Sequence, residues 1–232
     1  MFKHTILVAA VAGLVLAMAG SAQADLTGQL GLLDLTKDYG SGAGVNPATG
    51  NPWALGDPYH LAYVTTAQCT AESTDIADYN AFVQADANGA GMGAVAWYVM
   101  GSTADVDAKD NAVITGPVFG ISGSKYIALD AADFWDLVWP FSNPILTLTG
   151  SAKNVHFGTL AGGTEHLPLG NSTVRREWSG WANWSAAWAS WANTTQAEVV
   201  GVSQQLQIVP EPATLALLGL GGLGLILGRK RR

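Results

Sequence analysis

The chain has 232 residues, a formal net charge of −7, a hydrophobic fraction of 49% and one cysteine. A single cysteine excludes an intramolecular disulfide, so the fold must be held by packing. The acidic balance argues against nucleic acid as a partner, because an acidic protein and a phosphate backbone repel each other.

Residues 1–24 have the pattern of a signal peptide. Lys3 precedes an apolar run from about residue 6 to residue 19, and Ala22-Gln23-Ala24 places small residues where signal peptidase cleaves. An uncleaved anchor is the weaker alternative, since the run is short for a bilayer span of about 20 residues. We therefore expect signal peptidase to release a mature protein that begins at Asp25.

Residues 25–209 are long enough for one domain with its own core. This part holds 17 acidic residues (18 − 1) against 6 basic ones (11 − 5), a net charge of −11. We expect Cys69 to be buried and inert, since free cysteine usually behaves as a small apolar residue. The charge suits a soluble domain outside the cytoplasm.

The pattern of short elements predicts an α+β fold in which strands predominate. Turn-forming residues fill 39–58, which we expect to be a loop. Ser73 or Thr74 is expected to cap a helix that ends at Gly89, the clearest helix of the domain. Apolar runs between Gly, Asn and Ser turns predict strands at 59–66, 95–100, 117–121, 125–129, 145–149, 154–160 and 199–208.

Three segments carry a resemblance to a known family. They are residues 46–53 (NPATGNPW), 75–83 (DIADYNAFV) and 101–111 (GSTADVDAKDN). Together they resemble a domain of other sorted bacterial surface proteins, similar to C-type lectins of the endostatin type. The resemblance covers roughly residues 46–208, and it implies a mixed fold with a loop-rich binding side and no assigned activity. The chain departs from the lectin pattern because it lacks paired cysteines.

No motif of a known active site or metal site is present. Asp105, Asp107, Asp110 and Asn111 could offer oxygen ligands to calcium, but their spacing does not match an EF-hand loop, so we expect solvated turn carboxylates. We expect Asp130 to cap a short helix. His60, His156 and His166 are isolated in the sequence, and no Gly-x-Ser-x-Gly, phosphate-loop or His-Glu-x-x-His motif occurs. We expect no catalytic residue, metal or cofactor.

Five tryptophans follow one another at short intervals. Trp178, Trp181, Trp184, Trp188 and Trp191 are separated by 3, 3, 4 and 3 residues. At about 100° per residue they would share one face of a helix, whereas a strand would scatter them over both faces. We expect this face to pack into the core, because large aromatic residues dominate core burial. The alternative is an exposed platform on which sugar rings stack.

The C-terminal tail, residues 210–232, has three parts in order. Pro210-Glu211-Pro212 precedes an apolar span at 213–228, and Arg229, Lys230, Arg231 and Arg232 end the chain. As a helix the span covers about 24 Å, so it can cross a bilayer of about 30 Å only by thinning it or snorkelling its basic end. The positive-inside rule keeps the basic end in the cytoplasm and the domain on the periplasmic side of the inner membrane.

This tail resembles the PEP-CTERM sorting signal of Gram-negative bacteria that make extracellular polysaccharide. The resemblance implies recognition by an exosortase, a membrane-embedded cysteine protease or transpeptidase that would cut near the motif and pass the domain to the cell surface or matrix. An ordinary C-terminal membrane anchor with a proline-containing linker is the alternative.

We therefore expect a non-catalytic surface or matrix protein that binds, or is built into, extracellular polysaccharide. One alternative is a secreted hydrolase acting on matrix polymers, which would need two carboxylates about 5 to 10 Å apart. The other alternative is a self-associating adhesin or structural subunit.

Overall fold

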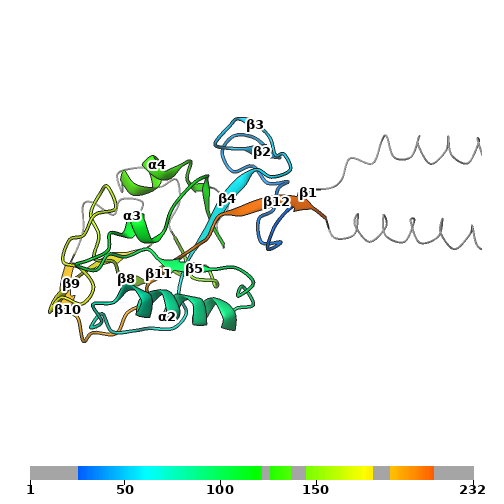
Figure 1. Cartoon of the computed structure of the whole chain (residues 1–232). Coiled ribbons are helices and arrows are strands. Elements are labelled where there is room, and N and C mark those ends of the chain that lie inside the picture. Colours follow the sequence, from blue (N-terminus) through cyan, green and yellow to red (C-terminus); the bar gives the residue numbers. More distant parts are fainter. Residues whose placement is uncertain (1–25, 122–125, 137–144, 180–188, 212–232) are drawn as a thin grey trace, which may run out of the picture. The chain divides into compact units, whose positions relative to one another are not determined.

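The computed structural model describes residues 26–121, 126–136, 145–179 and 189–211. Residues 27–209 form a compact unit with its own buried core (Figure 1). The strands are β1 (Leu26–Gly28), β2 (Val45–Asn46), β3 (Asn51–Pro52), β4 (Pro58–Val64), β5 (Trp97–Val99), β6 (Val118–Gly120), β7 (Tyr126–Ala128), β8 (Asn154–His156), β9 (Thr173–Trp178), β10 (Ala189–Ala192), β11 (Val200–Ser203) and β12 (Leu206–Pro210). The helices are α2 (Ile76–Gly89), α3 (Ala108–Asn111) and α4 (Ala131–Asp136). Strands predominate in the described residues, as the sequence predicts.

Strand β4 lies at the centre of the main sheet. One edge of β4 pairs with β11 and β12 in antiparallel fashion, and the other edge pairs with β6 in parallel. The sheet order is β1-β12-β4-β11-β5, with β6 on β4 and β7 on β6. Every β4 residue after Pro58 is buried. A strand covered on both faces needs a nearly continuous apolar run, and this explains why the segment hardly alternates in sequence.

The one histidine of β4, His60, is fully buried and hydrogen-bonded on both ring nitrogens. Its Nε2 accepts the backbone N–H of Thr115 at 3.0 Å, so its Nδ1 carries the proton and donates to the Ser203 carbonyl at 3.0 Å. Burial lowers the pKa of His60, although the bond to Ser203 opposes this shift. His60 therefore joins β4 to β11 as a neutral structural residue.

Helix α2 covers the edge strand β5 with two side-chain amides. Asn80 Oδ1 accepts the Val99 N–H at 2.8 Å, and Gln84 Oε1 accepts the Trp97 N–H at 3.0 Å. Asn80 and Gln84 are four residues apart and so lie on the same face of the helix. Strand β5 is the last strand in the sheet order, and the two amides accept hydrogen bonds from its backbone N–H groups. This edge of the sheet is therefore protected from pairing with another chain.

Several predicted boundaries need correction. The cap of α2 is Asp75, whose side chain accepts the Ala77 N–H, rather than Ser73 or Thr74. Residues 145–149 form a turn instead of a strand; they touch the sheet through one bridge between Thr147 and Val64. Residues 199–208 hold two strands, β11 and β12, that pair with different parts of β4.

The predicted signal peptide (residues 1–24) and the apolar span with its basic end (213–232) lie outside the described residues. Within the described ranges, no helix is both long and apolar enough to cross a membrane.

Candidate functional site

The small sheet of β10, β9 and β8 holds an unusual set of charged and aromatic side chains. Strand β9 lies in the middle and pairs with both neighbours in antiparallel fashion. Because side chains alternate along a strand, Arg175 and Glu177 lie on one face and Arg176 and Trp178 on the other. Four successive residues of β9, Val174 to Glu177, are buried. Charged side chains are seldom fully buried unless they are paired.

On the first face, Arg175 and Glu177 form a buried ion pair. The Arg175 Nε and Nη2 groups both donate to Glu177 Oε1, at 2.9 and 2.6 Å, and the two side chains are 0% and 1% exposed. Burial raises the pKa of Glu177 to about 7, although the bonds from Arg175 act in the opposite direction. Because solvent does not reach the pair, we assign it a structural role.

On the second face, Arg176 stacks on Trp191 of β10. The guanidinium carbon lies 4.5 Å from the centre of the indole ring, within the range of a cation–π contact. Arg176 is 7% exposed, and its Nε is buried without a hydrogen-bond acceptor. Burial lowers the pKa of Arg176, and the carboxylate of Glu198 opposes this shift.

The two tryptophans of this face are exposed. Trp178 is 38% exposed and Trp191 is 45% exposed. We call Arg176, Trp178 and Trp191 the Arg176 face. Trp191 on β10 lies opposite Val174 on β9. Arg176 comes two residues after Val174 and Trp178 four residues after it, so Arg176 lies between the two tryptophans along the strand direction.

This arrangement corrects the predicted tryptophan helix. Trp178 ends β9 and Trp191 lies in β10, so neither is helical, and neither is a core residue. Trp181, Trp184 and Trp188 lie outside the described residues, and a core or platform role for them stays a prediction.

His156 lies opposite Arg176 on β8 and is fully buried. Its Nε2 lies 2.8 Å from the Thr195 carbonyl, and burial lowers its pKa. In the part of the chain that the structure describes, no group of three or more His, Cys, Asp and Glu residues could hold a metal ion.

The acidic segment at 105–111 forms local structure. Asp107 precedes α3, and its Oδ1 accepts the Glu165 N–H at 2.9 Å. Asn111 exchanges hydrogen bonds with Asn80 and donates to the Val99 carbonyl at 2.9 Å. Near α4, Asp130 Oδ1 accepts the Asp133 N–H at 2.9 Å, which confirms the predicted helix cap.

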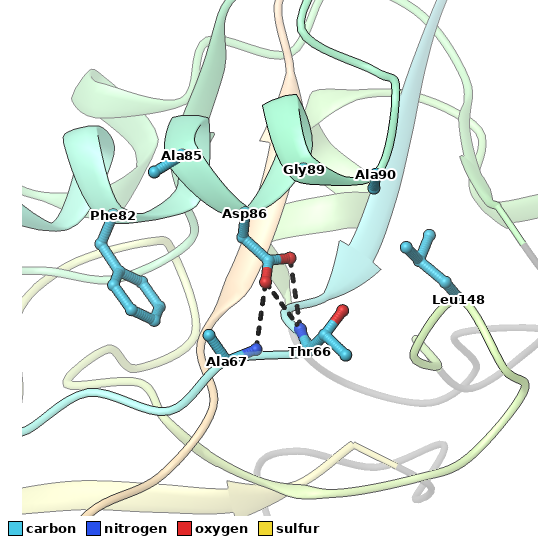
Figure 2. Close-up of a pocket in the computed structure, with 8 residues that line it drawn as sticks. All are labelled: Thr66, Ala67, Phe82, Ala85, Asp86, Gly89, Ala90 and Leu148. Atoms are coloured by element: carbon cyan, nitrogen blue, oxygen red, sulfur yellow. Dashed lines mark hydrogen bonds between the residues drawn. The ribbon is translucent and has the colours of Figure 1, made fainter.

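A groove of about 590 Å³ lies beside α2 (Figure 2). It is lined by Thr66, Ala67, Phe82, Ala85, Asp86, Gly89, Ala90 and Leu148. Asp86 is its one charged residue, and the carboxylate accepts the N–H groups of Thr66 and Ala67 at 3.0 to 3.2 Å, as Figure 2 shows. The carboxylate thus holds the chain after β4 against α2.

Cys69 is half-buried, and its backbone bridges Ala197. Burial raises the pKa of the thiol to about 11. A thiol with that pKa is almost fully protonated at neutral pH and therefore a poor nucleophile.

Comparison with known proteins identifies the tail. Residues 209–232 match the PEP-CTERM protein-sorting motif. The chain thus carries the signal of an exported protein that an exosortase processes, as the Pro-Glu-Pro pattern predicts. No curated protein and no solved structure matches the chain. The C-type-lectin-like fold therefore stays a prediction.

Proposed function

We propose that the chain is a non-catalytic protein of the cell surface or extracellular matrix that associates with extracellular polysaccharide through the Arg176 face. In this proposal the precursor is held in the inner membrane with its domain on the periplasmic side. Exosortase then passes the domain outward. The sorting motif at residues 209–232 supports the export route.

The observation that carries the binding role is the exposure of Trp178 and Trp191 at 38% and 45% on one sheet face. Large exposed aromatic side chains are costly for a soluble domain and are enriched at binding sites. A flat indole suits the apolar face of a sugar ring, and two indoles on a rigid sheet suit a polymer of several rings.

The test measures co-sedimentation of the full-length protein, in detergent, with extracellular polysaccharide from a bacterium that encodes an exosortase. We expect Trp178→Ala and Trp191→Ala each to weaken binding about two- to tenfold, since a stacked aromatic contact is worth about 0.5 to 1.5 kcal/mol. The melting temperature should change little for Trp178→Ala, and it should fall modestly for Trp191→Ala, which also removes the cation–π contact with Arg176.

The matched control is Leu55→Ala. Leu55 is 65% exposed and lies between β3 and β4, outside the small sheet. Its replacement should leave binding unchanged. If the tryptophan variants bind as well as the Leu55 variant, the Arg176 face is not the binding surface.

A further inference from the structure

We propose that the Arg176 face receives the carboxylate of an acidic sugar, so that the polysaccharide it binds is a polyuronate rather than a neutral polymer. This inference rests on the function proposed above and adds the chemical class of the ligand.

Three cations lie on or beside the small sheet: Arg175 and Arg176 on β9, and Lys153 directly before β8. Arg175 Nη2 lies 2.6 Å from Glu177, and Lys153 Nζ lies 3.8 Å from Glu198. Within the described ranges, Arg176 has no carboxylate oxygen within 4.0 Å. Arg176 is thus the cation of this sheet whose charge the protein does not neutralise by a direct ion pair.

The hydrogen bonding of Arg176 is incomplete. Its Nε is buried and has no acceptor among the described residues, and the residue as a whole is only 7% exposed. A buried donor without an acceptor destabilises the folded chain, and such groups are uncommon outside functional sites. A carboxylate matches the planar fork of a guanidinium, and because Nε itself is sealed from solvent, a ligand meets the small exposed part of the side chain.

The position of Arg176 between two exposed indoles also favours a sugar carboxylate. Trp191 holds the guanidinium by stacking at 4.5 Å, and the exposed indoles of Trp191 and Trp178 flank it. A sugar ring that lies on either indole brings a ring substituent toward Arg176. Because Arg176 is only 7% exposed, it can meet one small anionic group at a time. A single carboxylate suits this restriction. The acidic domain repels the other carboxylates of a polyuronate, as it would repel a nucleic-acid backbone, so the contact is confined to one uronate at a time and is measured at physiological salt, where the repulsion is screened.

The test compares two polymers of the same sugar, polygalacturonate and its fully methyl-esterified form, by titration calorimetry against the full-length protein in detergent. We expect the acid form to bind about tenfold tighter or more, the size of a hydrogen bond to a charged group. Arg176→Gln should bring the affinity for the acid form down to the affinity that the same variant has for the ester, so that the preference for the acid form is lost. Dextran sulfate, a third polymer, should bind less well than polygalacturonate if the site is built for a carboxylate.

A second variant guards against a folding defect. Arg176→Lys keeps a positive charge in the sheet but lacks the guanidinium fork, and it should reduce the preference for the acid form threefold or more. The inference is overturned if the unaltered protein binds both polymers equally, or if both variants keep the full preference. Equal binding would leave the proposed function standing, whereas the absence of binding to any polysaccharide would refute the proposed function itself.

Discussion

Replacing Gly201 tests the packing of α2 against the main sheet. A Cβ atom at Gly201 would lie 2.5 Å from Val83 Cγ1 and 2.8 Å from Tyr63 Cε1. Both side chains are fully buried, and the Tyr63 hydroxyl donates to the Val83 carbonyl at 3.1 Å, so neither can move aside freely. Overpacking of this kind typically costs about 1 to 3 kcal/mol. For a domain of this size, Gly201→Ala should lower the melting temperature by about 2 to 12 °C.

Circular dichroism during thermal denaturation measures this effect, with Gly89→Ala as the matched control. Gly89 ends α2, and a Cβ there would meet nothing within 4 Å. The control should therefore melt like the unaltered protein or slightly higher.

A double variant tests the cause. Val83→Ala removes the nearer of the two contacts, so Gly201→Ala should cost less in that background than alone. If Gly201→Ala melts like the Gly89 control, or if its cost is the same with and without Val83, the described contact between α2 and β11 is wrong.

Three further predictions address sorting and charge. Replacing Glu211 by Gln should leave the apolar span intact but impair processing, and a mature-size product formed at the normal rate on a blot would contradict recognition of the motif's carboxylate. Deleting residues 213–232 should release the protein from the membrane, because the span and its basic end are then gone; unchanged retention on fractionation would refute the anchor. Glu177→Gln tests the buried ion pair. Folding raises the pKa of Glu177 from about 4.5 to about 7. The contribution of Glu177 to the stability of the fold is therefore full below about pH 4.5 and is lost as the pH rises through 7. The melting temperature of the unaltered protein minus that of the Gln variant should therefore fall between pH 5 and pH 8. His60 and His156, whose lowered pKa values act in the opposite direction, are present in both proteins and cancel in this difference.

The sequence predicts the parts of the fold that are encoded by local apolar runs. Strand β4 and helix α2 were found because β4 is almost entirely apolar and α2 buries Tyr79, Val83 and Ala87 at intervals of four residues. The pairing of these elements could not be predicted, since it depends on contacts between distant residues. His60, for example, reaches Ser203 across 143 positions in the chain.

The sequence does not predict strand β9, because three of its four buried residues are charged. The segment Thr173–Trp178 has three ionic residues in succession, which in sequence is typical of an exposed loop. The tryptophan spacing predicts a helix where Trp178 and Trp191 in fact lie in strands. Intervals of three and four residues fit a helix, but the residues between the tryptophans include Ser, Gly and Asn, which are poor helix formers. The low helix propensity of these intervening residues argues against a helix in spite of the spacing.

The contrast between Arg175 and Arg176 shows what only the fold can supply. The two residues are adjacent and chemically identical, and nothing in the sequence separates them. Alternation along β9 places Arg175 on the face of Glu177, where the pair neutralises its own charge inside the protein. The same alternation places Arg176 beside two exposed indoles, where its Nε finds no acceptor. A one-residue difference in position thus separates a structural cation from the cation that we assign to ligand binding.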